Sequence, residues 1–168
     1  RQPGSTAKPI FDYGPGMEYN DFSTYTLFND EPWTYTNGPE IGNWDGSYQG
    51  LITLRQALSV SRNIPALKAF QQVDKKNIVT FVNNLGLDVA YSTKSENYKK
   101  DEKTGADNVI NEAYSIGGMA YGVTPLDMAE AYASFANGGY HIETHAVTKI
   151  EYRSTGETVD FSEEKKKV

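Results

Sequence analysis

The sequence predicts an α+β fold, with helices through most of the chain and a β-hairpin near its end. Apolar residues recur at helical spacing in successive segments between positions 6 and 137. Ser, Thr, Asn or Asp caps precede these segments and glycines follow several of them. After position 139, apolar and polar residues instead alternate on both sides of a short turn, as in paired strands. Helices and strands that occupy separate parts of a chain are typical of the α+β class.

The first predicted helix runs from Thr6 to about Tyr19. Pro9 lies close enough to its start that few backbone hydrogen bonds are lost. The Gly-Pro-Gly run at 14–16 is expected to break it. Residues 20–50 are rich in Tyr, Trp, Asn, Asp and Gly without steady periodicity, and they predict an ordered but irregular excursion.

Two helices follow the excursion. A capping box opens the first at Thr53, because Gln56 stands three residues after the cap, and this helix ends near Ser59. The second begins at Asn63, interpreted as its N-cap, with Pro65 in the first turn. A short break therefore separates the two helices.

The remaining helices have clear boundaries. One is capped by Asp74 and stops at Gly86. Residues 92–108 are polar and charged, and they predict an exposed loop. The last helix starts with the cap Thr124 and a proline at its first position, and it ends at Asn137.

The hairpin is predicted from residues 148–161. Thr, Ile and Tyr alternate with charged residues over 148–153, the turn STGE follows, and TVDF at 158–161 forms the second strand.

Composition excludes several classes of protein. A length of 168 residues suits one domain, or part of one. The net charge of −6, with both signs interspersed, argues against nucleic acid as a partner. The absence of cysteine excludes disulfides, thiol catalysis and cysteine-ligated zinc. No apolar stretch reaches the length of a membrane span.

Ser5 and Lys8 form a Ser-x-x-Lys pattern at the first helical turn. Residues three apart share a helix face, so the Lys8 amine is expected beside the Ser5 hydroxyl. A serine hydroxyl needs a neighbouring base, and a desolvated lysine can remove its proton. The alternative is that Ser5 only caps the helix and Lys8 is only a solvated lysine.

Ser61 and Asn63 lie in the break between two helices, where side chains can point into a cleft between rigid elements. A hydroxyl there can relay a proton to a leaving amine, and an asparagine amide can hold a substrate amide. The alternative is that Asn63 only caps the following helix.

Ser-x-x-Lys followed by Ser-x-Asn resembles the signature of penicillin-binding proteins and class A β-lactamases. The longer stretches RQPGSTAKPIFDYGPGMEY, NWDGSYQGLITLRQALSVSRNIPALKAF and IGGMAYGVTPLDMAEAYASFANGG look like the transpeptidase domain of class A, bifunctional penicillin-binding proteins. The resemblance implies the helical subdomain and part of the central antiparallel sheet of a penicillin-binding or serine β-lactamase-like fold. It also implies that residues 1–168 are a fragment of one transpeptidase domain, without the family's glycosyltransferase domain and membrane anchor.

The implied function is that of a peptidoglycan D,D-transpeptidase, a serine acyltransferase that acts on D-Ala-D-Ala stem peptides outside the cytoplasmic membrane and is acylated by β-lactams. The resemblance implies Ser5 as the nucleophile, Lys8 as its proton partner, and Ser61 with Asn63 as the second motif. Expected partners are stem peptides, β-lactam antibiotics and the remaining segment of the same domain. Membrane attachment is expected only through an N-terminal anchor, and no cofactor or metal is expected.

A Lys-Thr-Gly sequence occurs at 103–105, but its context differs from the family's third motif. That motif should lie on an inner strand after the helix ending in ANGG, whereas this one precedes that helix, is followed by Ala106 and has polar neighbours. We therefore interpret it as a chance match in a surface loop. The third motif, and with it one oxyanion-hole donor, is expected beyond Val168.

Two other functions remain as alternatives. The aromatic residues of the excursion could stack on sugars, which would suit a noncatalytic glycan- or peptidoglycan-binding module. Among enzymes, a D,D-carboxypeptidase or β-lactamase would pass the acyl group to water. His141, Glu143 and His145 alternate, yet they lack the context of a third ligand, so no metal site is predicted.

Overall fold

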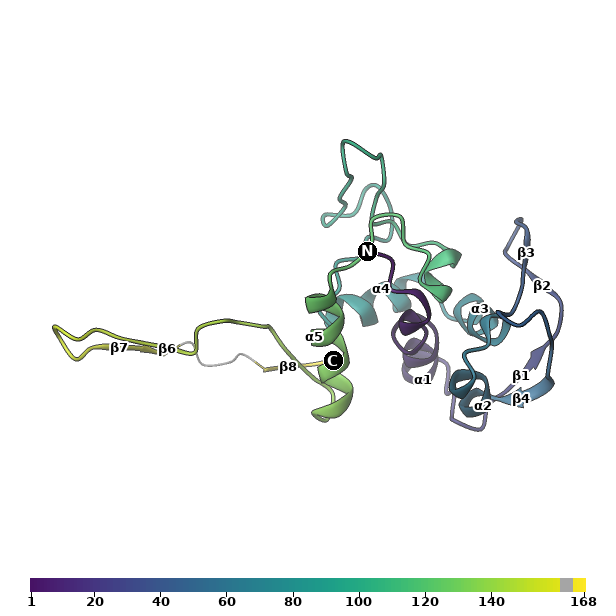
Figure 1. The fold of residues 1–168 in the computed structure, drawn as a ribbon, viewed down its shortest axis with the longest axis horizontal. Coiled ribbons are helices and arrows are strands. Elements are labelled where there is room, and N and C mark those ends of the chain that lie inside the picture. Colours follow the sequence, from purple (N-terminus) through teal and green to yellow (C-terminus); the bar gives the residue numbers. More distant parts are fainter. Residues whose placement is uncertain (161–164) are drawn as a thin grey trace.

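The computed structural model describes residues 1–160 and 165–168, and it has the predicted mixture of helix and strand. Helices form the body of the molecule, and the β-hairpin projects from it as a long arm (Figure 1). Phe161, the last residue of the predicted hairpin, lies outside the described residues.

The N-terminal segment is helical over its whole length. A 3₁₀ turn, η1 (Gly4–Ala7), leads into a π-helical turn, η2 (Pro9–Tyr13), and then into α1 (Gly14–Tyr19). The predicted break at 14–16 is wrong. Pro15 occupies the first turn of α1, where its missing N–H costs little. The two glycines instead allow aromatic side chains to pack closely against the helix. A Cβ at Gly14 would lie 2.8 Å from the Phe81 ring, and a Cβ at Gly16 would lie 2.2 Å from the Phe22 ring.

The excursion contains short strands that periodicity did not reveal. Strand β1 (Leu27–Asp30) pairs antiparallel with β4 (Gly50–Thr53), and β2 (Trp33–Thr34) pairs with β3 (Glu40–Ile41). The partner of β1 lies about twenty residues away in sequence, and β2 and β3 have only two residues each, so neither pair shows a run of alternation. The loop between β3 and β4 runs back toward the start of α3, which becomes important at the site.

The two middle helices are α2 (Leu54–Ser59) and α3 (Asn63–Gln72). The capping box at Thr53 is confirmed, since its hydroxyl accepts from the Gln56 N–H while the Gln56 side chain accepts from the Thr53 N–H. The N-cap prediction for Asn63 is wrong. Arg62 is the N-cap residue and makes no side-chain cap bond, and Asn63 is the first residue of α3.

The later elements largely follow the predictions. Helix α4 (Lys75–Asn84) is capped by Asp74, and α5 (Pro125–Ala136) begins with a capping box at Thr124. A 3₁₀ turn that was not predicted, η3 (Glu112–Ile116), precedes α5. Strand β5 (Tyr140–Ile142) pairs with β8 (Lys165–Lys167), and β6 (Lys149–Glu151) pairs with β7 (Thr158–Asp160), which confirms the hairpin.

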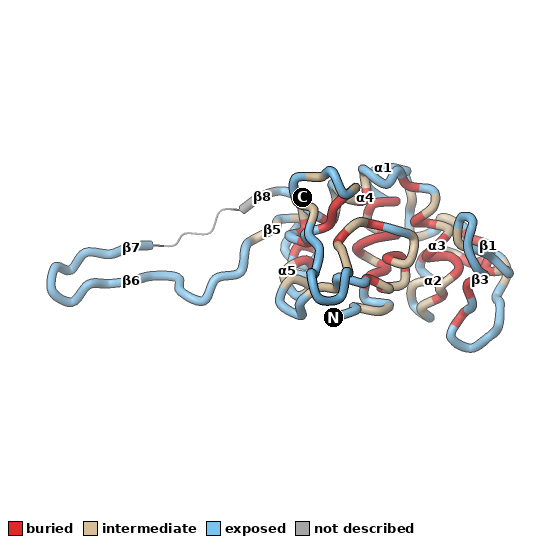
Figure 2. The backbone as a smooth tube through the Cα atoms, turned by 90° about the horizontal axis from the view of Figure 1, so that it is seen from above, coloured by how far each residue is buried: buried red, intermediate tan, exposed pale blue. Residues whose placement is uncertain are grey.

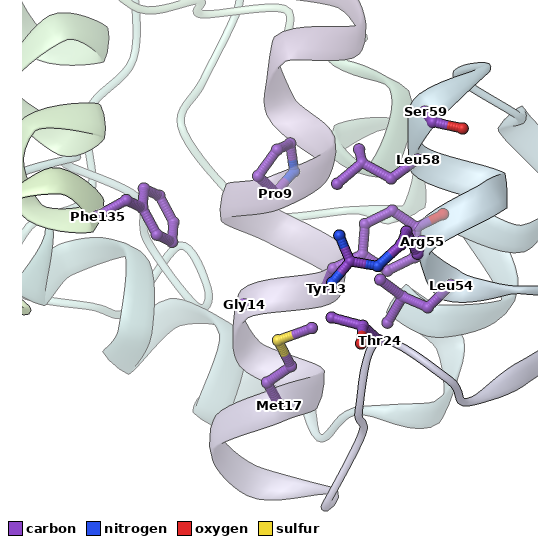
Figure 3. Close-up of a pocket in the computed structure, with 10 residues that line it drawn as sticks. All are labelled: Pro9, Tyr13, Gly14, Met17, Thr24, Leu54, Arg55, Leu58, Ser59 and Phe135. Carbon is purple, nitrogen blue, oxygen red and sulfur yellow. The ribbon is translucent and has the colours of Figure 1, made fainter.

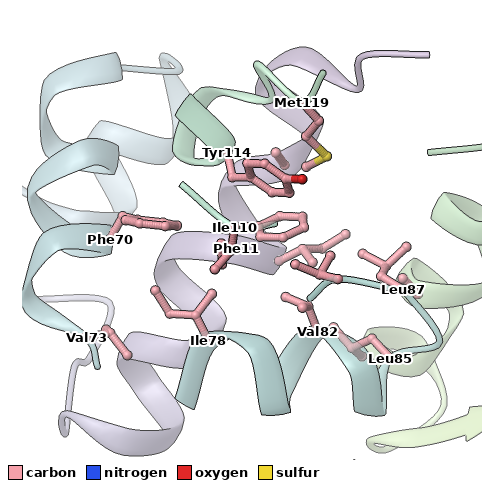
Figure 4. Packing of buried hydrophobic residues seen from close by; sticks show 14 residues of the cluster. Phe11, Phe70, Val73, Ile78, Val82, Leu85, Leu87, Ile110, Tyr114 and Met119 are labelled. Carbon is pink, nitrogen blue, oxygen red and sulfur yellow. The ribbon is translucent and has the colours of Figure 1, made fainter. Parts of the chain in front are cut away.

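The hydrophobic core surrounds the N-terminal helical segment. Figure 4 shows its largest cluster, in which Phe11 lies among residues of α4 and the segment after it, with Tyr114 against its ring edge-on at 5.5 Å. A second cluster joins Tyr13 to Phe28, Leu54 and α3. Figure 2 shows the buried residues concentrated in this body and the β6–β7 arm exposed. The turn that carries Ser5 and Lys8 therefore begins the helical segment around which this core packs.

Candidate active site

The residue immediately before Ser5 has a left-handed backbone conformation. Gly4 has φ +59°, a conformation that favours glycine, and η1 starts there. The Lys8 N–H donates to the Ser5 carbonyl, which places the two residues on one turn, as predicted. The Ser5 side chain is exposed, and its hydroxyl forms no hydrogen bond with any described residue.

The Lys8 amine is fully buried and faces the break between α2 and α3. Its Nζ lies 2.6 Å from the Ser61 carbonyl oxygen, 3.0 Å from Ser61 Oγ and 2.8 Å from Asn63 Oδ1. These acceptors match the three donors of an ammonium group. The structure therefore brings three of the four predicted residues into direct contact across more than fifty positions of sequence.

Burial lowers the pKa of Lys8 to about 8 from its usual 10.5, because the charged form loses hydration. The charge of Asp12, one turn further along, acts in the opposite direction but is outweighed. A lysine in this range can exchange its proton near neutral pH, unlike a surface lysine. Lys8 Nζ also lies within hydrogen-bond distance of the Ser61 hydroxyl, so a proton can pass between these two groups.

The turn between α2 and α3 has a strained backbone. Ser61 has φ +55°, rare for a residue with a side chain, and strain of this kind persists only where the surroundings enforce it. Asn63 does not cap its helix: its Nδ2 donates to the Gly42 carbonyl at 2.9 Å, which leaves Oδ1 facing Lys8. The alternative interpretation of Asn63 as a cap is therefore wrong, since both ends of its amide are engaged across the site.

Sequence reasoning missed the supports of this site. A Cβ at Gly117 would lie 2.2 Å from the Gly4 carbonyl oxygen, so the end of η3 and the turn that carries Ser5 meet backbone to backbone. The only local signal was the Gly-Gly pair in IGGM. Asn43, which accepts from the Asn63 N–H at 2.8 Å, gave no signal beyond its place in the irregular excursion.

The Lys-Thr-Gly at 103–105 lies in an exposed turn and not on a strand. Asp101 Oδ1 accepts from the N–H groups of Lys103 and Thr104, both at 2.8 Å, and Gly105 has φ +74°. In Figure 1 this segment belongs to the loop that rises beyond the N-terminus. The predicted surface loop is confirmed.

An apolar pocket of about 350 Å³ lies beside the site but does not contain it. Figure 3 shows its wall, which combines η2, α1 and α2 with Phe135 of α5. None of Ser5, Lys8, Ser61 and Asn63 lines this pocket. Ser5 and Lys8 thus lie toward the N-terminal end of the helical segment, whereas Met17 in the pocket wall lies toward its other end.

His141 and His145 make separate contacts. His141 Nε2 lies 2.5 Å from Glu130 Oε1, whereas His145 Nδ1 lies 3.3 Å from the Glu143 carbonyl oxygen. Across residues 1–160 and 165–168, no group of three His, Asp or Glu side chains is arranged to hold a metal ion. In the same part of the chain, no helix is both long and apolar enough to span a bilayer.

Comparison with known proteins gives one consistent result. The family model described as "Penicillin binding protein transpeptidase domain" matches residues 1–168. Penicillin-binding protein 1A/1B of Bacillus subtilis (strain 168) is 48% identical over 167 residues, which are 98% of this chain and 16% of that protein. Penicillin-binding protein 1A of Streptococcus pneumoniae is 40% identical over 162 residues, 95% of this chain and 21% of that protein. The chain therefore spans only a small part of the curated relatives that it matches.

Solved structures agree in fold. The crystal structure of penicillin-binding protein 1A from Haemophilus influenzae superposes with a TM-score of 0.72 at 25% identity, over 96% of this chain and 22% of that one. An imipenem acyl-enzyme complex of penicillin-binding protein A from M. tuberculosis gives 0.75 at 18% identity, over 99% of this chain and 39% of that one. With the family match over its whole length, this chain belongs to the penicillin-binding protein transpeptidase family.

Proposed function

We propose that this chain carries the nucleophile and the second motif of a peptidoglycan D,D-transpeptidase. One observation supports this most directly: the buried Lys8 amine lies within hydrogen-bond distance of Ser61 Oγ and Asn63 Oδ1, on the same turn as the exposed Ser5. A nucleophile, a lysine of lowered pKa and a second hydroxyl are the parts that serine acyl transfer needs. A glycan-binding module would have no use for them.

In the proposed reaction, neutral Lys8 takes the proton of the Ser5 hydroxyl as Oγ attacks the carbonyl between the two D-alanines. The C–N bond then breaks, and the leaving D-alanine amine receives a proton that passes from Lys8 through the Ser61 hydroxyl. An ester on Ser5 remains. The amine of a second stem peptide attacks this ester, forms the cross-link and returns the proton to Ser5 Oγ. A β-lactam opens its ring amide by the same first step, and its acyl group stays on Ser5.

The proposal extends to the domain and its setting. We take residues 1–168 to be part of one transpeptidase domain whose third motif follows later in the full-length protein, because the Lys-Thr-Gly within this chain lies in a turn. The glycosyltransferase domain and the membrane anchor would belong to other segments of that protein. The reaction would take place on the outer face of the cytoplasmic membrane, where stem peptides are found.

The test uses the full-length protein that contains this chain and a fluorescent penicillin. We expect label on the peptide that carries Ser5, and its loss in Ser5→Ala. Ser59→Ala is the matched control, because Ser59 is also exposed and its hydroxyl only contacts the Gln56 carbonyl. Label on another serine, or undiminished label in Ser5→Ala, would contradict the assignment.

A second measurement separates transpeptidase from carboxypeptidase and β-lactamase. With stem peptides as substrate, cross-linked dimers should accumulate along with released D-alanine. Release of D-alanine without dimers would indicate that water accepts the acyl group.

A further inference from the structure

Asn43 is a buried polar side chain, 7% exposed, that the proposed reaction does not use. Its amide is fully engaged. Oδ1 accepts from the backbone N–H of Asn63 at 2.8 Å, while Nδ2 donates to Asp30 Oδ1 at 2.7 Å and to the Ser47 carbonyl at 2.9 Å. This amide is held in one orientation, because a half-turn would place its NH₂ group against the Asn63 N–H and its oxygen against the Asp30 and Ser47 oxygens.

Asp30 lies behind Asn43 and is fully buried in β1. Its Oδ1 accepts from Asn43, its Oδ2 accepts from the Gln49 N–H at 3.0 Å, and Arg62 Nε lies 3.3 Å from Oδ2. The carboxylate can only accept, so it forces Asn43 to present Nδ2 to it. The Asn43 oxygen must then face Asn63.

Consecutive residues thus hold Asn63 at two points. Asn43 holds its backbone N–H, and the Gly42 carbonyl accepts from its Nδ2 at 2.9 Å. Together these bonds direct Asn63 Oδ1 toward Lys8 Nζ. The Arg62 side chain, 3% exposed, ties the same loop to the turn through Asp45 at 2.7 Å.

We propose that Asn43 is a positioning residue for acylation: with Asp30 behind it, it fixes Asn63 so that the Asn63 amide oxygen accepts from Lys8. The inference rests on the proposed function, because it assigns a role in the acylation of Ser5. Asn43 and Asp30 both belong to the irregular excursion at residues 20–50, so in this proposal the excursion positions the site without supplying a reacting group.

The arrangement has a measurable consequence for Lys8. An acceptor such as Asn63 Oδ1 favours the charged form of the amine. When Asn43 no longer holds Asn63, Lys8 loses that acceptor, while Asp12 on η2, the other titratable group that acts on the amine, is unchanged. The pH at which Lys8 becomes neutral should therefore fall, and a residue with a merely structural role would not move it.

The experiment compares Asn43→Ala with Asn108→Ala in the full-length protein. Asn108 is a close match: it is 2% exposed, its Nδ2 donates to the Asp88 and Asn97 carbonyls, and its Oδ1 accepts from the Lys99 N–H. It holds a loop away from the site. Acylation rate constants with a fluorescent penicillin are measured across a pH range of about 6 to 10, together with melting temperatures.

Both variants should melt at lower temperature than wild type. Only Asn43→Ala should lower the limiting acylation rate, by about tenfold or more, and shift the midpoint of the pH profile downward by about half a unit or more. An unchanged rate and midpoint in Asn43→Ala, or equal changes in Asn108→Ala, would overturn the inference. Wild type labelled at Ser5 is the internal check, since failure there refutes the proposed function and not the role of Asn43 alone.

A second variant keeps the test decisive if Asn43→Ala does not fold. Asp30→Asn presents an amide donor that drives Asn43 to turn its oxygen away from Asn63, so acylation should fall about tenfold and the midpoint of the pH profile should shift downward, as in Asn43→Ala. An unchanged rate and midpoint in a folded Asp30→Asn variant would refute the proposal.

Discussion

At the scale of single residues, Lys8 is held between opposing influences. Removal from water favours the neutral amine, whereas the three oxygen acceptors favour the ammonium, as does Asp12 when its carboxyl is ionised. Burial dominates, and the pKa falls to about 8. The residue is therefore mostly protonated at neutral pH, with a usable fraction neutral.

The first prediction concerns the pH dependence of acylation. Since only neutral Lys8 can take the Ser5 proton, the rate should rise with pH through about 8 and level off above it. Only about a tenth of the limiting rate is expected at one pH unit below the midpoint. Stopped-flow labelling with a fluorescent penicillin measures this profile. Lys8→Arg keeps its charge throughout and should stay inactive at every pH; a flat wild-type profile would exclude Lys8 as the base.

Asp12 gives a second prediction, on stability. Its carboxyl is fully buried, neither oxygen has a partner among the described residues, and burial raises its pKa well above the usual value. The folded state therefore keeps this proton at pH values where the unfolded state has lost it, so stability falls as pH rises above about 4. Asp12→Asn should match wild type near pH 4 and exceed it increasingly toward neutral pH, by up to about 1.4 kcal/mol per pH unit.

Urea unfolding of wild type and Asp12→Asn at a series of pH values measures this difference. Asp101→Asn provides a control of opposite sign. Hydrogen bonds from the Thr104 and Lys103 N–H groups lower the pKa of Asp101, so its stabilising contribution is present above the unfolded pKa and is lost as pH falls through the folded one. A gap between Asp12→Asn and wild type that does not change with pH would show that Asp12 is not protonated on burial.

At the scale of elements, close backbone contact determines the position of the turn that carries Ser5. Gly117 has φ +77° and meets Gly4, the residue before Ser5, with no room for a Cβ. Tyr132 of α5 adds a hydrogen bond of 2.8 Å to the Thr6 carbonyl. The turn is thus positioned by contacts with η3 and α5, although neither element carries any of Ser5, Lys8, Ser61 and Asn63.

Gly117→Ala should therefore slow acylation more than its backbone strain alone predicts. Gly105→Ala is the control, because Gly105 has a similar φ of +74° and open space around it. Both substitutions should cost about 1 kcal/mol in stability from the left-handed backbone, and Gly117→Ala should destabilise the protein further through its clash with the Gly4 backbone. Only Gly117→Ala should also reduce penicillin labelling, by about tenfold, as the clash displaces Gly4. Equal labelling of the two variants would show that the contact does not matter for the site.

The elements also show what sequence can reveal. Thr53, Asp74 and Thr124 were identified as caps because each satisfies backbone donors within its own first turn. Asn63 looked like a cap by the same local rule, yet its amide is engaged by Lys8 and by Gly42, which lie far away in sequence. Strands β1 and β4 were missed for the same reason. Local capping rules therefore predict where helices begin. The contacts of Asn63 and the pairing of β1 with β4 depend on partners far away in sequence, which local rules cannot identify.

At the scale of the whole molecule, the Lys-Thr-Gly at 103–105 is predicted to play no part in catalysis. Replacing Lys103 and Thr104 by Ala in the full-length protein should change penicillin acylation by less than about twofold, because surface substitutions rarely do more. The same change at the lysine of a strand-borne Lys-Thr-Gly later in that protein should abolish it. Loss of acylation in a folded Lys103 and Thr104 variant would place a third motif within this chain.

The arm formed by β6 and β7 differs from the body of the molecule in how often its backbone hydrogen bonds should open. All side chains of both strands are exposed, and two strands alone are marginally stable in water. Their amide protons should exchange with deuterium through frequent local opening, whereas those of α4, where Ile78 and Val82 are fully buried, should wait for global unfolding. Slow exchange in the arm of the full-length protein would therefore reveal that another segment covers it, and mass spectrometry of deuterated peptides can detect this without any substitution.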